Sequence, residues 1–217
     1  MSDAGAEGVL DAAREAFAAH RWGEARNGFL TARATRELSA ADMEAFAESA
    51  WWEGAIDEAL SGFEEAYRRY LQGDDPQQRS AAMLALDIGI SWFLRGEEAI
   101  GSGWLSRAER LLEDVPECVE HGYLQSLAID EALAEGRFDD AIALARSIAT
   151  MAERYGDETL CALVLVGEGI ARIKQGDVAG GLRVLDEAML PVVAGRVRPT
   201  YAGNIYCQLM NVCHELA

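Results

Sequence analysis

The chain has 217 residues, of which 50% are apolar and 26% charged, with 37 acidic side chains, 19 Lys or Arg, and a net charge of −18. This apolar content favours a folded chain over a disordered one, and the strong negative charge argues against direct binding of nucleic-acid phosphates by this segment. Only four prolines interrupt a sequence rich in alanine, leucine, glutamate and arginine, so we expect an all-α protein.

Apolar residues spaced with the period of a helix predict eleven helices. Residues 1–6 are expected to form a frayed tail, and residues 7–217 a single domain. The loop at Gly73 to Pro76 is the clearest in the chain. The expected helices cover 7–19, 22–34, 40–53, 56–71, 77–94, 97–112, 117–135, 138–155, 158–175, 178–194 and 199–217.

A short pattern recurs on every second helix: a small residue, an aromatic or aliphatic residue four positions later, and alanine or isoleucine three after that. Its sharpest copies are Ala25-Phe29-Ala32 and Ala59-Phe63-Ala66, and its weaker copies begin at Gly101, Ala141 and Gly181. The copies are 34, 42, 40 and 40 residues apart. A unit repeated in this way predicts an α-solenoid of antiparallel helical hairpins, here with about five and a half repeats.

Small residues are expected where the two helices of a hairpin cross, because only they allow a close approach. The expected pairs place Ala13, Ala47, Gly89 and Gly169 on the first helices against Ala25, Ala59, Gly101 and Gly181 on the second. The Trp22-Ala25-Phe29-Ala32 and Ile56-Ala59-Phe63-Ala66 stretches resemble the tetratricopeptide repeat (TPR) family. The resemblance covers nearly the whole chain and implies a TPR-like solenoid that binds a partner on its surface.

Two stretches carry a narrower resemblance. Residues 111–124, LLEDVPECVEHGYL, and residues 182–216 look like the TPR-like region of actinobacterial LuxR-type helix-turn-helix transcriptional regulators. In that family such a region senses or docks something, and a separate C-terminal module binds DNA. That module is missing here, because the sequence stops at Ala217 after what looks like the first helix of a sixth repeat. We therefore expect either a fragment, truncated at its C-terminus, or a stand-alone relative, with a homodimer through the C-terminal helices as one way to cover the last apolar face.

Motifs for chemistry are missing from the sequence. Cys118 and His121 share a C-x-x-H spacing, but Cys207, Cys213 and His214 lie about ninety residues away, so we expect no metal site. The sequence has neither a phosphate-binding G-x-x-x-x-G-K-[ST] loop nor a G-x-S-x-G nucleophile motif, so we expect no cofactor and no enzymatic activity. Scattered cysteines, no signal peptide and no long apolar run predict a cytoplasmic protein that does not bind membranes.

The TPR-like frame points one set of side chains on the first helices towards a concave surface. This predicted partner-binding groove comprises Glu44, Glu48, Trp51, Trp52, Leu86, Ile90, Phe93, Tyr123 and Asp130. An apolar and acidic groove suits a helix or an extended segment with basic flanks. The alternative for the Trp51-Trp52 pair is packing between repeats, since adjacent residues of a helix cannot both face the same side.

Two functions follow from the sequence. The first is a non-catalytic scaffold or regulatory domain that binds a protein or peptide. The alternative is a sensor that encloses a small molecule between its helices. The acidic charge has two interpretations as well, because it favours a basic partner but also keeps a helical surface soluble.

Overall fold

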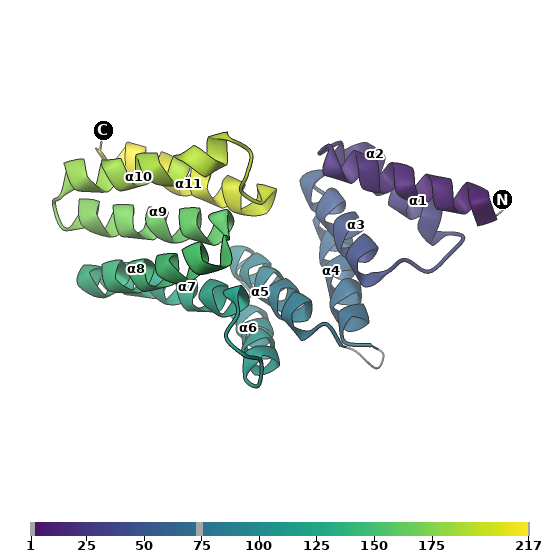
Figure 1. Ribbon diagram of the computed structural model, residues 1–217, viewed down its shortest axis with the longest axis horizontal. Helices are drawn as coiled ribbons and strands as arrows, with labels where there is room; N and C mark the ends of the chain where they lie inside the picture. Colours follow the sequence, from purple (N-terminus) through teal and green to yellow (C-terminus); the bar gives the residue numbers. More distant parts are fainter. Residues whose placement is uncertain (1–2, 73–75, 217) are drawn as a thin grey trace. The chain divides into compact units, whose positions relative to one another are not determined.

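The computed structural model describes residues 3–72 and 76–216, and in these ranges every regular element is a helix (Figure 1). The all-α prediction is therefore confirmed. The helices are α1 (Asp3–Ala18), α2 (Trp22–Arg33), α3 (Ala40–Trp52), α4 (Ile56–Tyr70), α5 (Gln78–Leu94), α6 (Glu98–Leu112), α7 (Val119–Ala134), α8 (Phe138–Tyr155), α9 (Glu158–Lys174), α10 (Val178–Val193) and α11 (Pro199–Leu216).

The helix boundaries follow the sequence prediction closely, with one difference at the N-terminus. Helix α1 begins at Asp3, four residues before the expected start at residue 7. Acidic and alanine residues favour the first turn of a helix, which explains why the helix extends into the expected tail. Residues 1–2 of that tail and residues 73–75 of the predicted loop lie outside the described residues.

Five hairpins pair α1 with α2, α3 with α4, α5 with α6, α7 with α8, and α9 with α10. Each first helix ends at one residue with a left-handed backbone, and the chain then reverses into the second helix. These residues are His20, Gly54, Gly96, Gly136 and Gly176, with φ between 55° and 94°. Glycine adopts this conformation without the steric penalty of a side chain, so four of the five hairpins use it. The α-solenoid prediction is confirmed.

The two helices of a hairpin approach each other through glycine. Gly89 lies against Gly101, and Gly169 against Gly181, because a Cβ added at Gly89 or Gly169 would lie 3.1 Å from the carbonyl oxygen of its partner. These two predicted pairs are confirmed. In the first two hairpins, a Cβ at Gly28 would lie 2.7 Å from the Cβ of Ala13, and one at Gly62 would lie 2.9 Å from that of Ala47. The closest approach there falls one helical turn after the predicted Ala25 and Ala59.

Two compact units make up the chain, one over 1–114 and the other over 115–217, and each is described by itself. The single domain over 7–217 stays a prediction. In the first unit, the ring of Tyr67 on α4 meets that of Trp104 on α6 edge to face, 5.0 Å between centroids. In the second, the buried carboxylate of Glu168 on α9 accepts hydrogen bonds from Arg146 on α8 and Arg172 on α9.

Candidate binding surface

Helix α3 presents an acidic stripe on the side opposite its core. Ser39 caps the helix by accepting a hydrogen bond from the backbone N–H of Asp42. The core side buries Met43, Phe46, Ala47 and Ala50. Three of the residues that the sequence placed in the groove, Glu44, Glu48 and Trp51, are half-buried on the other side of the helix.

Glu44 is held in place by the second helix of its own hairpin. The hydroxyl of Tyr70 on α4 donates a hydrogen bond to Oε2 of Glu44, 2.6 Å away. Burial and the negative charge of Glu44 raise the pKa of Tyr70 well above its ordinary value, so the phenol stays a donor across the physiological range. The carboxylate of Glu44 is therefore oriented by the fold.

Trp52 belongs to an aromatic stack between the first two hairpins. Its indole stacks on that of Trp22 with 5.7 Å between centroids and an interplanar angle of 16°. Trp22 also stacks on His20, at 4.9 Å and 14°. Trp52 is 37% exposed, so it forms an inter-repeat contact and still shows one edge to solvent.

Helix α5 presents a stripe that is rotated by one residue from the predicted one. Leu86 is 1% exposed, so it belongs to the core and cannot line a surface, which corrects the prediction. Ile90 is half-buried on the outer stripe, as is Asp87, which the sequence analysis missed. Leu94 at the end of the helix is 78% exposed. Phe93 is partly exposed but packs towards α6, where a Cβ at Gly101 would lie 2.8 Å from its ring.

A signal for Asp87 was present in the sequence. Helix α5 is apolar on nearly every side, and Arg79 and Asp87 are its only charged residues. A charged side chain is rarely buried without a partner, so Asp87 marks the outward side of an otherwise featureless helix.

Helix α4 connects these two stripes. The backbone N–H of Gln77, just before α5, donates to the carbonyl of Tyr70 at the end of α4. Arg95, just after α5, pairs with Asp57 in the first turn of α4. Helix α5 is therefore antiparallel to α4, as α3 is, and α3 and α5 run in the same direction. We call the half-buried and exposed residues Glu44, Glu48, Trp51, Asp87, Ile90 and Leu94 the α3–α5 surface.

The two predicted groove residues of α7 lie in the second unit. Tyr123 is 2% exposed, and its hydroxyl donates to Oδ1 of Asp157, the N-cap of α9, at 2.9 Å. Its ring meets that of Tyr201 on α11 edge to face. Tyr123 thus ties three helices together and does not line a surface, which corrects the prediction. Asp130 is exposed, and the surrounding protein raises its pKa by desolvation.

Cys118 and His121 are part of the start of α7. Nδ1 of His121 accepts a hydrogen bond from the backbone N–H of Cys118 at 3.3 Å, and the Cys118 sulfur lies 3.1 Å from the same nitrogen. This reciprocal arrangement is a capping box. Among the described residues no group of three or more His, Cys, Asp or Glu side chains is placed to hold a metal ion.

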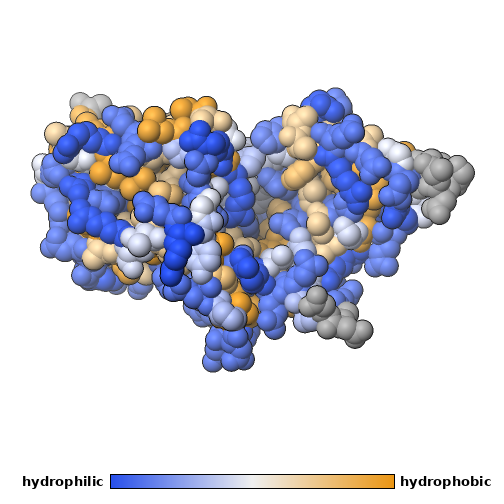
Figure 2. Space-filling view, viewed as in Figure 1, coloured by the Kyte–Doolittle hydropathy of each residue, from blue (hydrophilic) through white to orange (hydrophobic). Residues whose placement is uncertain are grey.

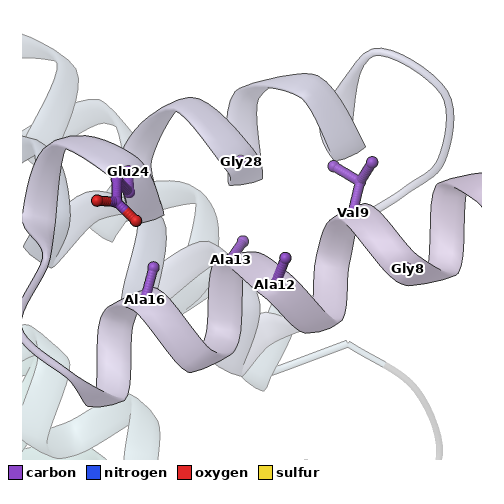
Figure 3. Close-up of a pocket in the computed structure, with 7 residues that line it drawn as sticks. All are labelled: Gly8, Val9, Ala12, Ala13, Ala16, Glu24 and Gly28. Carbon is purple, nitrogen blue, oxygen red and sulfur yellow. The ribbon is translucent and has the colours of Figure 1, made fainter.

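One apolar hollow of about 360 Å³ lies between α1 and α2 (Figure 3). Its lining residues are Gly8, Val9, Ala12, Ala13, Ala16, Glu24 and Gly28. The volume is within the range of small-molecule sites, but such sites also need several polar groups to orient a ligand. Glu24 is the one charged side chain of the lining, so the hollow lacks the features that would assign it a ligand.

The α3–α5 surface carries negative charge. Helix α3 contains Asp42, Glu44 and Glu48 and no basic residue. The only charged residue that α5 adds to the surface is Asp87. Apolar side chains, namely Trp51, Ile90 and Leu94, lie among these carboxylates. No described helix is both long enough and apolar enough to span a bilayer.

Comparison with known proteins gives the fold. No protein-family model matches the chain, and no curated protein matches it. Two solved structures of nearly identical TPR-like repeats from Podosopora anserina, assigned to a putative kinesin light chain, are similar at 13% identity. One of them, a variant with a single substitution, covers 88% of this chain and 96% of its own with a TM-score of 0.53, and the other covers 84% and 92% with a TM-score of 0.52. The chain therefore has the fold of a TPR-like α-solenoid.

Proposed function

We propose that this chain is a non-catalytic scaffold that binds a segment of another protein on its α3–α5 surface. The observation that carries the proposal is the composition of that surface, where three carboxylates lie among three large apolar side chains and no basic residue interrupts them. Apolar groups bind the partner's apolar residues, and the carboxylates select a partner with basic flanks.

The resemblance of residues 111–124 and 182–216 to LuxR-type regulators supports a regulatory setting for this scaffold. In that setting the chain receives a protein signal in the cytoplasm, and the contact with DNA belongs to another module. The strong negative charge of the chain is compatible with this division of roles, because it disfavours phosphate binding by the chain itself.

A designed pair of peptides tests the proposal. Both carry leucines at helical spacing, but one has terminal arginines and the other terminal glutamates. Fluorescence anisotropy with the full chain is expected to show binding of the arginine peptide and at least tenfold weaker binding of the glutamate peptide. Equal binding of both peptides, or binding of neither, would contradict the proposal.

The alternative, a small-molecule sensor, predicts a different result. A ligand that binds only the folded chain raises its melting temperature. A metabolite that stabilises the chain and still does so after Glu48→Gln would favour a sensor over the α3–α5 surface.

A further inference from the structure

Helix α11 has one face against the second unit and one face in solvent. Its buried residues, Tyr201, Ile205 and Val212, follow helical spacing, and the helix packs on α9. Its opposite face exposes Tyr206, Met210 and Leu216, and Met210 is 63% exposed. Leu190 and Val193 on α10 are exposed as well. Figure 2 shows this apolar patch over the region of α10 and α11.

The exposed face of α11 corresponds to the side that is covered in the other repeats. Counted from the first residue of each helix, Met210 in α11 has the position of Gly169 in α9, eleven residues on. The buried residues Tyr201, Ile205 and Val212 correspond in the same way to the buried Leu160, Val164 and Ala171. Gly169 is the point where α10 crosses α9. Met210 therefore marks the place where a second helix would cross α11, and no described helix does so.

The charge of α11 indicates what covers this face. The chain has a net charge of −18, so most of its surface repels a second copy. In α11, however, the only side chains of the acidic and basic residue types are His214 and Glu215, and Glu215 is paired with Lys174 on α9. The exposed face of α11 also lacks the charges that would select a basic or an acidic partner. It is a region where two copies of this acidic chain can meet without strong repulsion.

We propose that two copies of the chain pair through α11, with helix α11 of each copy taking the place of the missing second helix of the other. Second helices run antiparallel to first helices in this fold, so the two α11 helices pair antiparallel about a twofold axis near Met210. Cys207 and Cys213 are exposed and lie three residues on either side of Met210. The twofold axis therefore brings Cys207 of one copy beside Cys213 of the second.

Light scattering on the full chain tests this pairing. We expect a mass of twice 23.5 kDa that falls to the monomer mass on dilution. Met210→Lys places two like charges at the axis and is expected to give the monomer at every concentration, with an unchanged circular dichroism spectrum. Leu94→Lys is the matched control, because it puts the same charge on an equally exposed apolar residue of the first unit. A monomer in the unaltered chain, or a dimer that Met210→Lys leaves intact, overturns the proposal.

Cross-linking gives a second measurement that does not depend on Met210. A short bismaleimide is expected to link the unaltered chain into a covalent dimer, and the double variant Cys207→Ser/Cys213→Ser is expected to lose that product. Cys118 is buried and Cys161 is half-buried, so they react less readily. A covalent dimer that persists in the double variant would place the interface elsewhere and overturn the proposal.

Discussion

The carboxylate of Asp42 on α3 accepts two hydrogen bonds from the guanidinium of Arg14 on α1, at 2.8 and 2.9 Å. The hydroxyl of Ser39 donates a third, at 2.6 Å. Asp42 is buried, whereas Arg14 is about half exposed. This ion pair joins the first helices of two successive hairpins, so it fixes the stacking of the repeats that positions the α3–α5 surface.

The ion pair predicts a pH-dependent contribution to stability. Burial alone would raise the pKa of Asp42, but the hydrogen bonds from Arg14 and Ser39 outweigh it and hold the pKa below 3.8. A carboxyl whose pKa is lowered by folding stabilises the protein above its unfolded pKa, and the contribution is lost as the pH falls below it. Asp42→Asn should lower the free energy of unfolding by about 1–2 kcal/mol at neutral pH, and the difference should narrow below about pH 4.

Urea unfolding followed by circular dichroism checks this prediction. Asp11→Asn is the matched control, because Asp11 bonds the same guanidinium from an exposed position and should contribute less than about 1 kcal/mol. A difference between Asp42→Asn and the unaltered chain that stays constant down to pH 3 would show that the ion pair has no role in the stacking.

The glycine crossings predict opposite effects for two similar substitutions. Gly169→Ala adds a Cβ that would lie 2.7 Å from the Leu185 side chain, so the helices must separate, and we expect a loss of about 1–3 kcal/mol. Gly103→Ala on the exposed side of α6 meets no atom within 4 Å and should gain up to about 1 kcal/mol from helix propensity. Melting temperatures of the two variants that move in the same direction would contradict this account of the crossings.

The Trp22–Trp52 stack predicts an interaction energy between the two indoles. A double-mutant cycle with Trp22→Ala and Trp52→Ala should give a coupling of about 0.5–1.5 kcal/mol, as for other aromatic pairs. Denaturant unfolding of the four proteins measures it. Additive effects would show that Trp52 does not pack on the first hairpin and would return it to the candidate binding residues.

The sequence was sufficient for the fold because each hairpin carries its own local signals. Helix α8, Phe138–Tyr155, has the boundaries predicted from its periodicity and from the glycines on either side. The crossings at Gly89 and Gly169 were also predictable, because a small residue recurs at a fixed distance before each turn.

The binding surface was less predictable because it depends on contacts between distant residues. Tyr123 was predicted to be exposed, but its hydroxyl bonds Asp157 on another helix. Leu86 was predicted to line the groove, but α5 is apolar on almost every side, so periodicity could not identify its outward stripe. Trp52 was assigned to the groove because its stacking partner, Trp22, is thirty residues away in the sequence.

The affinity of the arginine-flanked peptide for a carboxylate-free α3–α5 surface tests the central claim most directly. In the variant Glu44→Gln/Glu48→Gln/Asp87→Asn, we expect about tenfold weaker binding, since three ion pairs of about 0.5 kcal/mol each sum to about 1.5 kcal/mol. The loss should shrink at high salt, and the control Glu109→Gln/Glu113→Gln, on the exposed side of α6 and just after it, should bind like the unaltered chain. Unchanged affinity in the triple variant, with helicity intact, would contradict a binding role for the α3–α5 surface.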